Sequence, residues 1–140
     1  MCGRLKPKPF LLSGQMPGNG AAGETICTVV EGEITPVRIG NRIEFARWEG
    51  CARRESIDLW LNKKGYKPCT LPLESFFEGS TEVKLPEGCE LQGVIKRFLD
   101  GSAVCRNLTK QASTEREKEI AAYHPRPGHN RVPILAKVGA

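Results

Sequence analysis

The sequence predicts a single α+β domain over residues 1–140, made mostly of short β-strands with about two helices. Two observations support this fold class. The 15 glycines and 10 prolines among 140 residues indicate many turns and favour a loop-rich fold over a helical bundle. Most apolar segments are also short and end at turn residues, as strands do, whereas only two segments have helical patterns.

The first part of the chain predicts a loop followed by strands. Residues 5–24 combine Lys6-Pro7-Lys8-Pro9 with several glycines, which indicates an irregular loop. The strand-like segments that follow are residues 26–30, 33–39 and 42–45. Gly40-Asn41 separates the last two and predicts a tight hairpin turn.

The middle of the chain predicts a helix and an interrupted strand. Residues 55–64 place Ile57, Trp60 and Leu61 at helical spacing, and Gly65 is a plausible stop. Residues 69–73 are apolar but contain Pro72, so we expect a strand that ends there or lies at a sheet edge.

The last part of the chain predicts a hairpin, a capped helix and a final strand. Residues 91–98 and 103–109 read as strands joined through Asp100-Gly101. Thr114 and Glu117 have the spacing of a capping box, which opens a charged helix running to about residue 123. Residues 132–138 are the last strand candidate.

Charge and cysteine content narrow the class of protein. The net charge of +5 permits a phosphate-bearing partner without requiring one. No stretch is long and apolar enough for a membrane span or a signal peptide, so we expect a cytoplasmic protein with reduced thiols. The six cysteines are widely spaced without any close pair. We therefore expect mostly buried thiols, no metal site and no cofactor.

The start of the chain, Met1-Cys2-Gly3-Arg4, raises a chemical question. A cysteine in a loose, exposed terminus is a liability unless its chemistry is used. If Met1 is removed, Cys2 carries an α-amine next to its thiol, and the two groups together can capture an aldehyde as a thiazolidine ring. The alternative is that Cys2 is incidental.

Glu78 follows two aromatic residues, Phe76 and Phe77. A carboxyl group that is partly desolvated by aromatic side chains has a raised pKa, which suits proton transfer near neutral pH. The alternative is a surface glutamate in the turn Glu78-Gly79-Ser80.

Residues 46–55 contain Arg47, Trp48, Arg53 and Arg54. Arginine forks match phosphate oxygens, and an indole can stack on a base. This segment could therefore bind single-stranded DNA. The alternative is a solvated basic segment leading into the helix, with Trp48 in the core.

Both histidines lie in one segment, His124-Pro125-Arg126 followed by His129-Asn130-Arg131. A histidine beside a cation is discouraged from charging, so it can stay neutral and exchange protons. The alternative is a pair of loop or capping histidines.

Together these segments resemble the SRAP (SOS response-associated peptidase) family. The start Met1-Cys2-Gly3-Arg4, the segment PCTLPLESFFEG at residues 68–79 and the segment HNRVPIL at residues 129–135 follow the family's order. Weaker similarities are Ala46-Arg47-Trp48, residues 52–56 and residues 107–112.

The resemblance implies an open or barrel-like mixed sheet and covalent capture of abasic sites in single-stranded DNA. It implies catalytic roles for Cys2, Glu78 and His129, with self-processing peptidase or lyase activity. The residues implied in DNA binding are Arg4, Arg47, Trp48, Arg53, Thr109 and Arg131. We expect a monomer that acts in DNA repair.

Three departures from the family pattern stand out. Cys51 replaces an asparagine, Gly79 replaces a tryptophan, and His124 is a second candidate for the working histidine. The alternative function is a non-covalent single-stranded DNA-binding module that uses Arg47, Trp48, Arg53 and Arg54.

Overall fold

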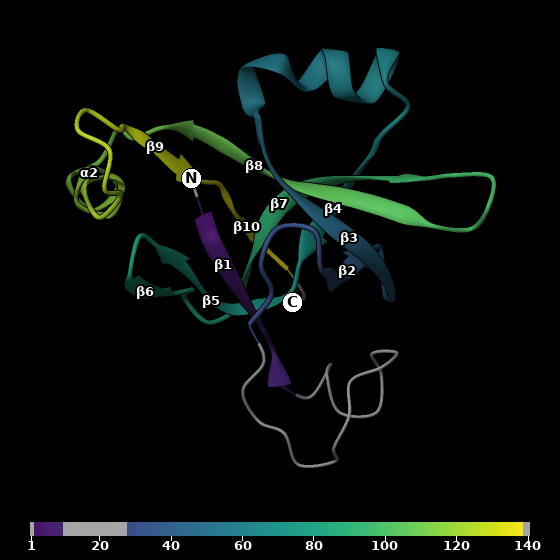
Figure 1. Ribbon diagram of the computed structural model, residues 1–140, viewed down its shortest axis with the longest axis horizontal. Helices are drawn as coiled ribbons and strands as arrows, with labels where there is room; N and C mark the ends of the chain where they lie inside the picture. Colours follow the sequence, from purple (N-terminus) through teal and green to yellow (C-terminus); the bar gives the residue numbers. More distant parts are fainter. Residues whose placement is uncertain (1, 10–27, 139–140) are drawn as a thin grey trace.

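The computed structural model describes residues 2–9 and 28–138, except for the side chain of Cys2. It has two sheets, one of seven strands and one of three (Figure 1). The α+β, mostly β fold class predicted from the sequence is confirmed. Within the described ranges, no helix has the length and apolar character needed to cross a membrane.

Five strands of the larger sheet close into a barrel. They are β2 (Ile34–Ile39), β3 (Arg42–Arg53), β4 (Lys67–Leu71), β7 (Cys89–Arg97) and β8 (Ala103–Gln111). The ring runs β4-β2-β3-β8-β7 and returns from β7 to β4. The β3–β8 pair is parallel, and the other pairs are antiparallel. The barrel-like alternative is therefore the one that the structure adopts.

The chain end fills the gap where β7 and β8 separate. Strands β9 (Arg131–Pro133) and β10 (Leu135–Lys137) pair with β8 and β7 respectively. Between them, the amide of Ile134 donates to Leu108 and its carbonyl accepts from Gln92. This segment was expected as one strand, but it changes partner at Ile134 and so forms two.

A smaller antiparallel sheet packs against the barrel. It contains β1 (Cys2–Pro7), β5 (Leu73–Glu78) and β6 (Thr81–Lys84), in the order β1-β5-β6. The expected loop at residues 5–24 is wrong at its start, because residues 5–7 pair with β5. Residues 10–24 lie outside the described part of the chain. Pro72 separates β4 from β5, as the interrupted pattern indicated.

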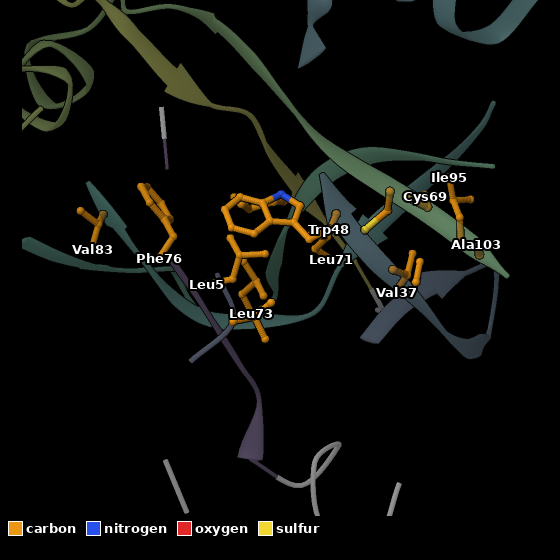
Figure 2. Close-up of a cluster of buried hydrophobic side chains, with 14 residues drawn as sticks. Leu5, Val37, Trp48, Cys69, Leu71, Leu73, Phe76, Val83, Ile95 and Ala103 are labelled. Carbon is orange, nitrogen blue, oxygen red and sulfur yellow. The ribbon is translucent and has the colours of Figure 1, made fainter. Parts of the chain in front are cut away.

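The main hydrophobic core lies between the barrel and the smaller sheet. Trp48 of β3 is 1% exposed and is surrounded by Leu5, Leu71 and Phe76, among others (Figure 2). These residues come from four strands of the two sheets. Replacing a buried aromatic residue by alanine costs about 3–5 kcal/mol, so this cluster holds the two sheets together.

Both predicted helical segments are confirmed, but the first contains a 3-10 helix and a π-helix. Residues 54–63 form the short 3-10 helix η1 (Arg54–Ser56), a helical turn and the π-helix η2 (Leu59–Lys63). Helix α2 (Glu115–Ala122) begins with the capping box of Thr114 and Glu117. The predicted strand at 42–45 is longer, extending to Arg53. In the predicted strand at 26–30, Val29 makes only an isolated bridge with Leu5, and residues 26 and 27 are outside the described ranges.

Candidate active site

Glu78 ends β5 inside the protein rather than on its surface. Strand alternation turns Phe76 and Glu78 inward and leaves Phe77 only half-buried, and Glu78 is 0% exposed. Across the strand pair, the backbone of Cys2 is in register with Glu78. The surface-turn alternative for Glu78 is therefore wrong, and the start of β1 and the end of β5 meet at one corner of the sheet.

Gly79 is required at this corner. Its φ of +60° lies in the left-handed region, and a Cβ there would be 2.4 Å from the carbonyl oxygen of Tyr123. The end of α2 therefore comes down directly onto the residue after Glu78. This close approach explains why no larger side chain follows the glutamate in this chain.

His129 lies against Glu78. Its Nε2 is 3.9 Å from Oε2 of Glu78 and 3.1 Å from the carbonyl oxygen of Arg131. Because a carbonyl oxygen can only accept, the hydrogen-bonded tautomer of neutral His129 has its hydrogen on Nε2. The side chain is 5% exposed, so the pair is shielded from solvent.

His124 stacks on His129. The ring centroids are 4.1 Å apart and the planes differ by 23°. Nδ1 of His124 accepts a hydrogen bond from the backbone amide of Arg126. Of the two candidate histidines, His129 is therefore the one in contact with Glu78, and His124 forms the wall behind it.

Burial shifts the pKa values of this pair in opposite directions. It raises the pKa of Glu78 to about 7, since the charged carboxylate is disfavoured away from water. It lowers the pKa of His129 to about 4, and the neighbouring His124 adds to that effect. Near neutral pH, the proton available at this corner is therefore carried by Glu78, while His129 is neutral.

A basic pocket of about 260 Å³ opens beside the two histidines. The residues that line it are Cys51, Ala52, Arg53, Thr109, His124, Arg126, His129 and Arg131. Arg53 and Arg126 make no ion pair within residues 2–9 and 28–138. These two cations are therefore available to an anionic ligand.

Arg131 is already held in place. Its guanidinium contacts both oxygens of Glu55, at 2.7 and 3.0 Å, and it donates to the carbonyl and hydroxyl oxygens of Thr109. The same ion pair lowers the pKa of Glu55 to about 2. A phosphate bound by Arg131 would either share its guanidinium with Glu55 or displace Glu55 from it.

The structure corrects one of the residues assigned to DNA binding. Trp48 is in the core, where its Nε1 donates to Oδ1 of Asn107 at 2.9 Å, so its ring is not open to a base. The core alternative for Trp48 is the correct one. Arg47 is exposed and paired with Glu49 at 3.0 Å, and Arg4 is exposed near the ring of Phe77.

Asn107 is a polar residue of this region that the sequence analysis missed. It is 0% exposed, and its Oδ1 lies 3.6 Å from Sγ of Cys51, its partner in the β3–β8 register. An amide therefore lies beside residue 51 even though residue 51 is a cysteine. An asparagine at a core-facing position of an apolar strand was the available signal.

The other described cysteines do not line this pocket. Cys69 and Cys105 are buried, as expected for reduced thiols, and burial raises the pKa of Cys69 to about 12. Cys89 is half-buried. In the part of the chain that the structure describes, no three His, Cys, Asp or Glu side chains gather as a metal site would need.

Comparison with known proteins gives support for the fold alone. No family model matches the chain, and no curated protein is significantly similar to it in sequence. A crystal structure of a protein from Bordetella bronchiseptica superimposes with a TM-score of 0.65 at 13% identity, covering 96% of this chain and 83% of that one. The chain therefore has the fold of that protein.

Proposed function

We propose that this protein captures abasic sites in single-stranded DNA through a covalent bond to Cys2. The observation that carries the proposal is the corner where the backbone of Cys2 is in register with Glu78. An acid with a pKa of about 7 and a neutral imidazole lie within 3.9 Å of one another at that corner. This arrangement suits the reaction of an aldehyde with an amine and a thiol.

The proposed reaction balances without any cofactor. After removal of Met1, the Cys2 amine adds to the aldehyde carbon of the ring-opened abasic sugar to give a carbinolamine. Loss of one water gives an imine, and the thiol then adds to the imine carbon while its proton passes to nitrogen. The product is a thiazolidine with one water released.

Glu78 and His129 have complementary roles in this proposal. Loss of water from the carbinolamine needs a proton donor, and Glu78 keeps its proton up to about neutral pH. His129 is uncharged at that pH and can exchange a proton at the ring-opened sugar. Because the reaction needs a reduced thiol, a cytoplasmic location is part of the proposal.

The basic pocket would hold the DNA phosphates next to the abasic sugar. Arg53 and Arg131 line it together with Thr109, and Arg126 adds a third cation. Arginine forks match phosphate oxygens. Binding through these contacts would weaken as salt concentration rises.

The test is a denaturing gel with single-stranded DNA carrying one abasic site, after intact mass has established that Met1 is absent. We expect a heat-stable band with the wild type and none with Cys2→Ala. Cys89→Ala is a matched control, because Cys89 is half-buried at the start of β7, and it should crosslink like the wild type. Absence of the band in the processed wild type would contradict the covalent mechanism. Salt-sensitive binding without a band would instead favour the non-covalent module.

A further inference from the structure

Cations and aromatic rings alternate beside a second hydrophobic cluster of the barrel, against which Trp60 and Tyr66 pack half-buried. We call this set of side chains the cation–aromatic stripe. Its members are Arg106, Trp60, Lys64, Tyr66, Lys96 and Phe98. They come from β7, β8, η2 and the residues that follow η2 and β7.

Trp60 is the centre of the stripe. Nζ of Lys64 is 4.2 Å from the centroid of its ring system, and the guanidinium carbon of Arg106 is 5.0 Å from it. The ring of Tyr66 meets Trp60 edge-on, with centroids 5.0 Å apart and planes at 89°. Two rings and two cations therefore form one contact group.

Lys96 continues the stripe toward the β7–β8 hairpin. Its Nζ is 5.9 Å from the Tyr66 ring and 5.4 Å from the Phe98 ring. Phe98 is 42% exposed and follows β7 directly, in the turn of the β7–β8 hairpin, whose tip lies at the far right in Figure 1. The stripe therefore ends on an open aromatic ring.

The other end of the stripe meets the basic pocket. Arg106 donates through Nη1 to the carbonyl oxygen of Cys51 at 3.4 Å, and Cys51 lines the pocket. The stripe and the pocket therefore approach each other at Cys51 of β3.

The stripe has a net positive charge. Lys64 and Lys96 make no ion pair in the described part of the chain, and their ring contacts leave the charge uncompensated. Glu49 lies 3.9 Å from Arg106, but it also pairs with Arg47. Aromatic rings interleaved with uncompensated lysines are typical of surfaces that bind single-stranded nucleic acid.

We propose that the cation–aromatic stripe binds the undamaged single strand that continues from the pocket. Bases would stack on the rings of Trp60 and Phe98, while Lys64 and Lys96 contact phosphates. Stacking of a base is stronger than an exposed cation–π contact, so a lysine can leave the ring for a phosphate. The choice of single-stranded DNA as partner rests on the proposed function, but the binding needs no abasic site.

Tryptophan fluorescence can report on the stripe directly. The chain has two tryptophans, and Trp48 is buried in the core while Trp60 lies in the stripe. The experiment titrates Cys2→Ala protein with oligothymidylate that contains no abasic site. We expect quenching of Trp60 emission on binding. Trp60→Leu keeps an apolar side chain there and should abolish the quenching.

Removing the charges of Lys64 and Lys96 gives a second measurement, the salt dependence of binding, which does not rely on tryptophan fluorescence. The double variant Lys64→Gln/Lys96→Gln should reduce the slope of log K against log salt by about 1.4, since each single-strand phosphate contact contributes about 0.7. Affinity at about 0.1 M salt should fall by roughly 25-fold, which is about fivefold for each lysine. The matched control Lys118→Gln/Lys137→Gln removes two exposed lysines outside the stripe and should bind like the wild type.

The outcomes separate this proposal from the covalent one. Equal affinity of the two double variants for oligothymidylate would overturn the stripe as a binding surface, whatever the crosslinking result. In parallel, the stripe variant with Cys2 intact is tested for crosslinking to an abasic oligonucleotide too short to reach the stripe. A normal band is expected there. Stripe-dependent binding with no crosslink in the wild type would overturn the covalent mechanism alone.

Discussion

Two glutamates in this protein are equally buried, yet their pKa values are shifted in opposite directions. Glu78 and Glu90 are both 0% exposed. Burial raises the pKa of Glu78 to about 7. Burial would also raise the pKa of Glu90, but hydrogen bonds from Arg38 and Thr70 outweigh it and hold that pKa below its ordinary value.

The partners make the difference. Glu90 receives hydrogen bonds from Arg38 at both carboxylate oxygens, from Thr70 at 2.7 Å and from Lys8 at 3.4 Å. Glu78 faces the neutral imidazole of His129 at 3.9 Å. A buried carboxyl group surrounded by charged donors stays an anion, and removing one of those donors destabilises the fold. A carboxyl group whose pKa is raised mainly by burial keeps its proton near neutral pH, as the proposed role of Glu78 requires.

The largest expected effect on stability is at the Glu90 cluster. Arg38→Met removes the fork and leaves a buried carboxylate with weaker partners, so the free energy of unfolding should fall by about 3 kcal/mol. Urea denaturation measures this loss. Arg42→Met removes an exposed arginine from the neighbouring strand and should change stability by less than about 0.5 kcal/mol. Similar losses in both variants would mean that Glu90 does not depend on Arg38.

The corresponding change at Glu78 should affect chemistry instead of stability. Glu78→Gln removes the proton donor, and the rate of crosslinking should fall by about 100-fold. The free energy of unfolding should not fall, because burial already disfavours the charged carboxylate that glutamine replaces. Glu82→Gln alters an exposed carboxylate of the same sheet and serves as the control. A folded Glu78→Gln protein that crosslinks at the wild-type rate would remove Glu78 from the mechanism.

Sequence patterns predicted the features of the fold that depend on neighbours along the chain. The Gly40-Asn41 and Asp100-Gly101 hairpins and the Thr114 capping box are local structures, and all three form. Phe76 and Phe77 likewise indicated that Glu78 would be near aromatic side chains.

The contacts between residues far apart in the sequence could not be predicted from local patterns. Glu90 lies between Cys89 and Leu91 in an ordinary strand, and its partner Arg38 is 52 residues away. The burial of Trp48 also depends on β1, which the turn-rich start of the chain did not predict. Closure of the barrel brings these residues together, and single-sequence periodicity carries no information on which strands pair.

The pH dependence of stability should separate the contributions of Glu78 and His129. In Glu78→Gln, His129 remains with a folded-state pKa of about 4, below its ordinary 6.5. The unfolded chain then binds more protons in that window, so the free energy of unfolding falls as pH is lowered from 6.5 to 4.

The converse variant should respond in the opposite direction. In His129→Asn, Glu78 remains with a folded-state pKa of about 7, above its ordinary 4.5. The folded state then binds more protons, so the free energy of unfolding rises as pH is lowered from 7 to 4.5. Urea denaturation between pH 5 and pH 6.5 should give slopes of opposite sign, each roughly 1 kcal/mol per pH unit. The Glu90 contribution is common to both variants. Parallel slopes would refute the assigned pKa directions.

The smallest expected effect comes from replacing a threonine by valine in each of the two regions. Thr70→Val removes a hydroxyl that donates to the buried Glu90 carboxylate and should cost about 1–2 kcal/mol. Thr109→Val removes an acceptor from Arg131, but Arg131 keeps Glu55 and the Thr109 carbonyl as partners, so the loss should be under about 0.5 kcal/mol. Both losses are measured by urea denaturation at pH 7. The same lost hydroxyl should cost more at Glu90 because a buried charge loses a donor there, whereas a charge at the pocket keeps its other partners. Equal losses would show that Thr70 contributes to packing and not to the charge state of Glu90.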